Sequence, residues 1–191
     1  MESVTPASPS SEVKGLWFTV GRRYVLENFG QAALDACIAH MGPEHGIILA
    51  EALPSMWYPE ETLRSTLRAL DDVLAKGVPS EYLRIIEEAS LLGINHFFRA
   101  LLRLVAPGTM LRKIPTMWSI MRRGTARPTV DVHGAHAVVH YTDFPYFDDA
   151  HYRLLTKAAI QSLMRLCGDH QARVDLGDFT SDSLTVDVRW G

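Results

Sequence analysis

The residues VDVHGAHAVVHY, numbered 130–141, carry the clearest β-strand pattern in this chain. Two runs of alternating apolar and polar residues flank the dipeptide at 134–135, an arrangement typical of a β-hairpin with a two-residue turn. With that turn, His133 faces His136 across the two strands. One face of the hairpin is then apolar and is expected to cover a core; its residues are Val130, Val132, Ala137, Val139 and Tyr141.

The same hairpin contains three histidines, and histidine is a common zinc ligand. All three fall on its polar face, where His140 would face Thr129. Residues four apart on a strand are roughly 13 Å apart, so His136 and His140 cannot share one zinc ion whose ligands lie about 2 Å away. We therefore expect no metal site, and we interpret His133, His136 and His140 as residues of a solvated sheet face.

Upstream of the hairpin, apolar residues recur with helical spacing. Residues 14–41 predict two helices separated at Gly30, and residues 59–77 predict a third. The strongest helical pattern covers 80–106, and a shorter helical stretch at 109–124 is broken at Pro115. The first part of the chain is therefore expected to be a layer of helices.

Downstream of the hairpin, residues 146–170 predict a long helix with Asp148 as its N-cap and Gly168 near its end. Residues 171–179 and 183–190 predict two more strands. This order favours an α+β fold, in which a helical layer packs on an antiparallel sheet of about four strands. We expect a single α+β domain over 14–191, preceded by a disordered tail at 1–13 that is rich in serine and proline.

The composition gives no sign of export or of a membrane span. The longest apolar stretch, 89–106, is interrupted by Asn95, His96, Arg99 and Arg103, and the N-terminus has no apolar signal region. The two cysteines, Cys37 and Cys167, are too far apart in the sequence to suggest a disulfide framework. We expect a cytoplasmic protein without a membrane span.

Charge is unevenly distributed, although the net charge is only −3. Residues 89–130 contain seven basic residues and no acidic one, and both flanking segments are acidic. Such a basic block can form a surface for an acidic protein partner, and solvated helix faces are the alternative explanation. The candidate residues of this basic surface are Arg99, Arg103, Arg122, Arg123 and Arg127.

Catalytic signatures are missing from the sequence. It contains no glycine-rich phosphate loop, no G-x-S-x-G and no H-E-x-x-H. Adjacent acidic residues, such as Glu60 with Glu61 and Asp148 with Asp149, lie near predicted helix ends, where solvation explains them better than acid–base chemistry. We expect a protein that is not an enzyme, with no catalytic residues and no nucleic-acid partner.

The segments KGLWFTVGRRYVLENFG, LPSMWYPEETL and GINHFFRALLRLVAPGTMLRKIPTMWSIMRRG, followed by a hairpin that ends in DFP, resemble a mostly myxobacterial paralogous family of about 200 residues. The resemblance extends from Gly15 to Trp190. That family is similar to a superfamily that includes the heme nitric-oxide-binding (H-NOX) domains, the 4-vinyl-reductase sensory domains and the TRAPP vesicle-tethering subunits. The resemblance implies helices packed on an antiparallel sheet, often with an apolar cavity between them.

The H-NOX resemblance also specifies where heme-binding residues would lie. H-NOX domains have a proximal histidine on the helix before the sheet, and Trp118 stands in about that place. They hold the heme propionates with a Tyr-x-Ser-x-Arg motif, for which this chain has Tyr141, then Asp143 instead of serine and Pro145 instead of arginine. We therefore expect no heme and no other cofactor.

Two functions remain as predictions. The first is a non-enzymatic signalling or scaffold module that acts through protein–protein interaction, with or without regulation by a small molecule; the resemblance implies a homodimer. The alternative is a sensor of the 4-vinyl-reductase type that binds a small apolar ligand in an internal cavity. The candidate pocket residues are Trp57, His96, Phe97, Trp118, Tyr141 and Phe144.

Overall fold

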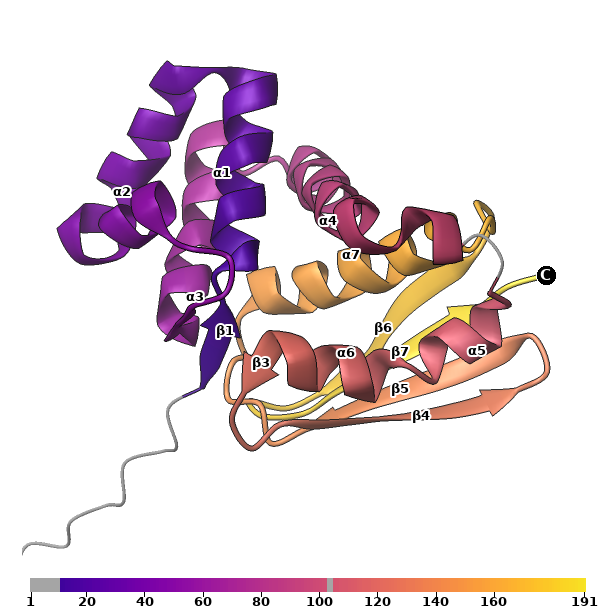
Figure 1. Ribbon diagram of the computed structural model, residues 1–191. Helices are drawn as coiled ribbons and strands as arrows, with labels where there is room; N and C mark the ends of the chain where they lie inside the picture. Colours follow the sequence, from indigo (N-terminus) through magenta and orange to yellow (C-terminus); the bar gives the residue numbers. More distant parts are fainter. Residues whose placement is uncertain (1–10, 103–104) are drawn as a thin grey trace, which may run out of the picture.

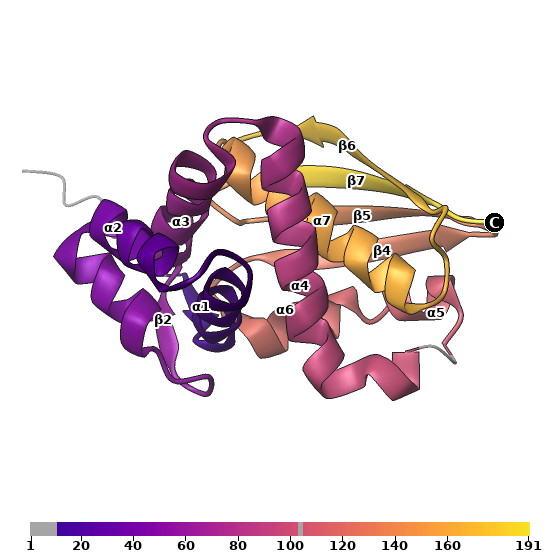
Figure 2. The same cartoon turned by 90° about the horizontal axis from the view of Figure 1, so that it is seen from above.

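The computed structural model describes the backbone of residues 11–102 and 105–191, and the side chains of these residues except 94–102. A four-stranded antiparallel sheet carries helices on one face (Figure 1). Helix α7 (Ala150–Leu166) lies on the sheet, and α4 (Pro79–Leu102) packs on α7 from above (Figure 2). The expected α+β architecture is confirmed.

The N-terminal helices form a group beside this layer (Figures 1 and 2). As predicted, Gly30 separates α1 (Leu16–Phe29) from α2 (Gln31–Glu51). Helix α2 is kinked at Gly42, which has a φ of 75° and is followed by Pro43. Helix α3 (Glu60–Ala69) then continues into the π-helix η1 (Leu70–Ala75). None of the described helices combines the length and apolarity of a membrane span.

The predicted helical stretch 109–124 is only partly correct. It forms two short helices, α5 (Pro107–Leu111) and α6 (Ile114–Met121), which lie near the β4–β5 half of the sheet. The chain leaves the helical conformation at Arg122, whose φ and ψ are −138° and 148°. Residues Arg122–Arg123 form strand β3 instead of the predicted helix end.

The main sheet has the order β4-β5-β7-β6, with β4 (Arg127–His133), β5 (His136–Thr142), β6 (Arg173–Phe179) and β7 (Leu184–Arg189). The predicted hairpin register is confirmed, since His133 pairs with His136 and Thr129 with His140. The apolar face, including the fully buried Val139, points to the helices. His136 makes a cross-strand contact with Asp187, at 2.7 Å. Over residues 11–93 and 105–191, no group of three or more His, Cys, Asp or Glu side chains has an arrangement that could hold a metal ion.

A second, smaller sheet was not predicted. Its order is β2-β1-β3, with β1 (Glu12–Lys14) between β2 (Trp57–Pro59) and β3. Val13 is fully buried, so the folded domain begins before the predicted boundary at Lys14. Residues 1–10, the rest of the predicted tail, lie outside the described residues. Strands this short show no sequence period and form only when distant segments meet.

The start of α7 differs from the prediction by one residue. Asp149, and not Asp148, is the N-cap, because its side chain accepts a hydrogen bond from the backbone N–H of His151 at 2.9 Å. Asp148 is exposed. The helix ends before Gly168, whose φ of 89° explains the glycine there.

We expect opposite effects from adding one methyl group at two glycines of the N-terminal helices. A Cβ on Gly15 would lie 2.0 Å from the carbonyl oxygen of Leu53 and 2.7 Å from the ring of Tyr58, whereas a Cβ on Gly21 meets nothing within 4 Å. Gly15→Ala should lower the free energy of unfolding by about 1–3 kcal/mol through overpacking. Gly21→Ala should raise it by about 0.5–1 kcal/mol, because it lies inside α1. Urea unfolding measures both, and equal stability of the two variants would contradict the packing of the 53–58 segment on Gly15.

Candidate functional site

A buried ion pair lies where the N-terminal helices meet the sheet layer. Arg122 of β3 donates from Nε to Oε1 of Glu60, the first residue of α3, over 3.2 Å. The side chains are 8% and 0% exposed. Glu60 is thus not the solvated residue that the sequence suggested, and Arg122 is not part of an exposed basic surface. Both corrections have one cause: each charge neutralises the other inside the protein.

Three aromatic rings surround the guanidinium group of Arg122. Its Cζ atom lies 4.4 Å from the ring centroid of Trp118, 5.3 Å from that of Trp17 and 5.7 Å from that of Phe144. The flat, weakly hydrated guanidinium group stacks on such rings better than a lysine ammonium group does. The rings therefore replace part of the hydration that Arg122 loses on burial.

Tyr152 of α7 completes the environment of Glu60. Its hydroxyl group donates to the backbone carbonyl of Glu60 at 2.9 Å and to Oε1 at 3.1 Å. Burial, followed by the charge of Glu60, raises the pKa of this phenol well above its ordinary value, so the hydroxyl group keeps its proton. Glu60 consequently connects α3, β3 and α7.

Three of the predicted pocket residues come together at this place. The ring centroid of Trp118 lies 5.2 Å from that of Tyr141 and 5.2 Å from that of Phe144. Phe144 in turn contacts Phe147 and Tyr152, at 5.0 and 5.4 Å. These rings pack against one another, and Tyr141 and Phe144 are buried. In this part of the predicted pocket the aromatic side chains thus contact one another.

The other predicted pocket residues do not join this cluster among the described contacts. Trp57 lies on the small sheet, with Lys14 Nζ and Arg123 Cζ at 4.3 and 4.1 Å from its ring centroid. The side chains of His96 and Phe97 lie outside the described residues. The junction also contains Trp17, Glu60 and Tyr152, which were not predicted as site residues because no local sequence pattern marks them.

The predicted basic surface is divided by the fold. Arg123 is exposed and pairs with Glu12 at 3.8 Å. Arg127 is also exposed and donates to the carbonyl groups of Gly124 and Ala126, at 3.0 and 2.8 Å. Arg99 and Arg103 lie outside the described side chains. Of the candidates that the structure describes, only Arg123 and Arg127 are available at the surface.

A second polar network attaches the start of α7 to the N-terminal helices. Asp149 Oδ2 accepts from Arg64 at 2.9 Å and from Arg68 at 3.0 Å. The ring of His151 contacts Asp149 Oδ1 at 2.8 Å and Asp71 of η1 at 3.1 Å. Burial alone would raise the pKa of Asp149, but the hydrogen bonds from Arg64 and His151 outweigh it and lower the pKa from 3.8 to about 2.

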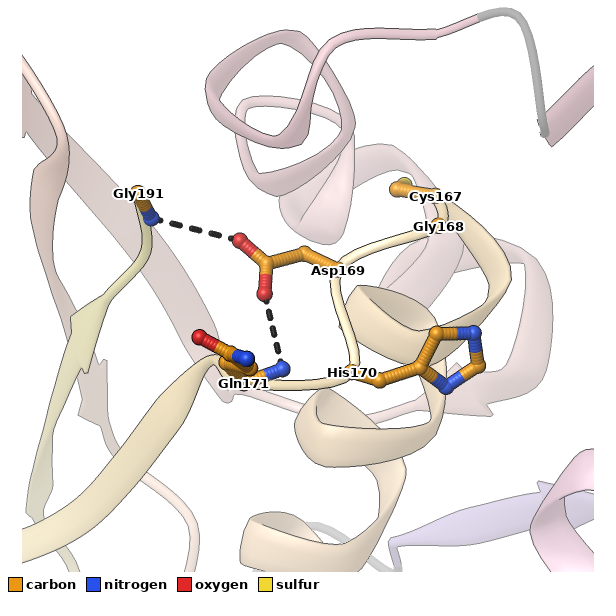
Figure 3. A pocket seen from close by; sticks show the side chains of 6 residues that line it. All are labelled: Cys167, Gly168, Asp169, His170, Gln171 and Gly191. Atoms are coloured by element: carbon orange, nitrogen blue, oxygen red, sulfur yellow. Dashed lines mark hydrogen bonds between the residues drawn. The ribbon is translucent and has the colours of Figure 1, made fainter.

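A shallow pocket of about 530 Å³ lies at the end of α7 (Figure 3). Its central carboxylate, Asp169, accepts from the backbone N–H groups of Gln171 and Gly191, at 2.9 and 3.3 Å. Burial raises the pKa of the nearby Cys167 thiol, which makes it a poor nucleophile. This pocket contains none of the predicted site residues, and Asp169 serves to hold the backbone.

The H-NOX resemblance raises the question whether the residues of this junction could bind heme. Trp118, in the place of the proximal histidine, has no nitrogen lone pair for iron and is packed against Arg122. The stretch from Tyr141 to Pro145 supplies no cation for a propionate, and the guanidinium group of Arg122 is already paired with Glu60. The described residues of this junction do not fit heme.

The Glu60–Arg122 pair should be strongly coupled. Glu60→Gln or Arg122→Met alone leaves one charge buried without its partner, and each should lower the free energy of unfolding by about 3–5 kcal/mol. The double variant should lose clearly less than the sum of the two, which a double-mutant cycle by urea unfolding measures. As a control, Arg23→Ala breaks the exposed Arg23–Glu27 pair and should change stability by less than about 1 kcal/mol. Additive losses would show that the two charges do not stabilise each other.

Acid should weaken the attachment of α7. A carboxylate whose pKa is lower in the folded state stabilises the fold above its unfolded pKa of about 4, and this stabilisation disappears as pH falls through about 2. The advantage of the wild type over Asp149→Asn should therefore shrink by roughly 2 kcal/mol between pH 5 and pH 2. Asp148→Asn, which changes the exposed neighbour, is the matched control. A pH-independent difference between wild type and Asp149→Asn would contradict the lowered pKa.

No protein-family model and no curated protein matches the sequence. Solved structures do match the fold. The Fe(II) unliganded H-NOX protein from K. algicida is 13% identical, with a TM-score of 0.68 over 93% of this chain and 96% of that chain. A point mutant of the H-NOX protein from T. Tengcongensis is 13% identical, with a TM-score of 0.64 over 93% and 97%. An oxygen-binding H-NOX domain related to soluble guanylate cyclases is 11% identical, with a TM-score of 0.62 over 93% and 94%.

These identities are too low to transfer a function, and the resemblance to the myxobacterial paralogous family stays a prediction. The coverage is nearly complete on both sides, so the likeness concerns the whole architecture and not a shared fragment. This chain therefore has the fold of the H-NOX domains, with an ion pair and aromatic side chains packed into the junction between its two parts.

Proposed function

We propose that this chain is a non-enzymatic signalling or scaffold module that uses the H-NOX fold to bind partner proteins. The observation that carries the proposal is the packed junction. Trp118, which stands in about the place of the proximal histidine, packs against Arg122, and Arg122 is already paired with Glu60. Because this arginine is paired and no histidine stands in that place, recognition at the surface is the function that the geometry supports best.

The thiol groups support a function without nucleophilic catalysis. Burial raises the pKa of Cys37 to about 11, so it stays protonated at neutral pH and lacks a thiolate. The Cys167 thiol is shifted in the same direction. Both cysteines thus have the character of structural residues.

The partner in this proposal is a protein with an acidic surface, bound through exposed cations such as Arg123 and Arg127. A cytoplasmic location and assembly as a homodimer are further parts of the proposal; the first derives from the sequence and the second from the resemblance. The neighbouring structures are described as H-NOX proteins, one of them oxygen-binding. For this chain we propose that the shared architecture serves as a stable support for a binding surface.

Mass spectrometry and hemin titration test this function. We expect the purified chain to give its apo mass of 21.4 kDa, or a multiple of it, under native conditions and to release no small molecule on denaturation. Added hemin should give no saturable one-to-one Soret absorption band. Cross-linking in the extract of the producing cell should identify a protein partner whose binding weakens as salt rises.

Other outcomes would replace the proposal. Stoichiometric heme would contradict the interpretation of Trp118 as a non-ligand. A released apolar molecule would favour the sensor alternative, and Trp118→Ala should then reduce the stabilisation that this molecule gives to the fold. If cross-linking identifies no protein and nothing is released, the interaction function is wrong.

A further inference from the structure

A cluster of apolar and cationic side chains stands out on the surface of the small sheet. Leu53 and Met56, in the segment between α2 and β2, are 60% and 53% exposed. Trp57 follows on β2, and both Lys14 and Arg123 contact its half-buried ring. We call these five residues the 53–57 patch.

The backbone that presents the patch is held in place by hydrogen bonds. The N–H of Gly15 donates to the carbonyl of Met56 at 2.8 Å, and Lys14 Nζ donates to the carbonyl of Ser55 at 3.1 Å. The N–H of Leu53 donates to the hydroxyl oxygen of Tyr58 at 3.0 Å. Leu53 and Met56 are thus exposed on a fixed segment, so a partner would lose little free energy in ordering it.

Arg123 is the accessible cation of the patch. It is 58% exposed, and its carboxylate partner Glu12 is 3.8 Å away, beyond hydrogen-bond distance. Lys14 is half-buried, and its Nζ lies 4.3 Å from the centroid of the same indole ring. Tryptophan, arginine and methionine are enriched at the centres of protein–protein interfaces, and the patch combines all three.

From this arrangement we infer that the 53–57 patch is the docking surface for a partner protein that brings apolar side chains to Leu53 and Met56 and carboxylates to Arg123 and Lys14. The inference rests on the proposed interaction function and names its surface. The proposed surface lies at the edge of the small sheet and not on the predicted basic block. Of the residues of that block, only Arg123 belongs to the patch.

Charge also argues against a second copy of the chain as the occupant. A two-fold symmetric contact between copies would bring each patch against its own equivalent, so that Lys14 and Arg123 would face the same cations. An acidic segment of another protein avoids this repulsion, because its carboxylates would face the cations of the patch.

Binding of short synthetic peptides tests the surface. The probes are a peptide with two leucines flanked by glutamates, the same peptide with lysines in place of the glutamates, and a third with serines in place of the leucines. Backbone amide NMR titration should show shifts at residues 14, 53, 56, 57 and 123 with the first peptide only. Its affinity should fall at least about tenfold in Leu53→Asp/Met56→Asp and in Arg123→Glu, and it should fall as salt rises.

Matched changes elsewhere separate the patch from general effects of charge or polarity. Ile120→Asp changes another exposed apolar residue, 57% exposed, and Arg173→Glu reverses another exposed cation. Both should bind the acidic peptide as the wild type does. Equal losses in these controls, or shifts at other residues, would overturn the assignment, as would the absence of peptide binding.

Two further measurements address the other occupants. Sedimentation of vesicles of phosphatidylserine and phosphatidylcholine should leave the chain in solution, and Leu53→Asp/Met56→Asp should leave its native mass unchanged. Vesicle binding that the double variant loses would make the patch a lipid-binding surface instead, and dissociation of a dimer by that variant would make it a self-association surface. If the double variant still cross-links to the same partner as the wild type, the interaction function stands and only this surface is wrong.

Discussion

The ion pair between Glu60 and Arg122 is the interaction on which the arrangement of the two parts depends. Burying either charge alone lowers the stability of the fold. This loss is offset only where the two charges pair and neighbouring groups hydrogen-bond to them or pack on them. Tyr152 supplies a hydroxyl donor to Glu60, and aromatic rings cover the guanidinium group. Because Glu60 begins α3 and Arg122 lies on β3, the pair connects the N-terminal helices to the sheet layer.

The small sheet explains how Arg122 reaches Glu60. Strand β3 interrupts what the sequence presents as a helix end, and it pairs with β1, which itself pairs with β2 immediately before α3. The same three strands hold Trp57 and Arg123 at the surface. One short sheet therefore links the buried ion pair to the 53–57 patch, with Arg122 directed inward and Arg123 outward as adjacent strand residues.

The H-NOX fold thus carries a different junction in this chain. A fold sets where elements lie, and the side chains placed at a site set its chemistry. Here the described side chains at the junction are already paired or packed with one another, and Trp118 is part of that packing. The architecture is shared with H-NOX proteins, whereas the described residues at this junction do not fit heme.

Local patterns were sufficient for much of the fold. The hairpin register followed from a period of two and a two-residue turn, because both are properties of neighbouring residues. The helix order followed from apolar spacing, with an error of one residue at the cap of α7. Three of the predicted pocket residues, Trp118, Tyr141 and Phe144, contact one another, and their role as a ligand pocket stays a prediction.

The sequence by itself determined the α+β class, most of the helices and the hairpin, because each depends on residues close together in the chain. Only the tertiary structure decided that Glu60 and Arg122 are buried, that 12–14, 57–59 and 122–123 form one sheet, and that Trp57 lies apart from the aromatic cluster. The neighbouring residues in the sequence do not tell whether a charged residue in a basic block is exposed or buried. Its burial depends on a partner 62 residues away, and only folding brings that partner to it.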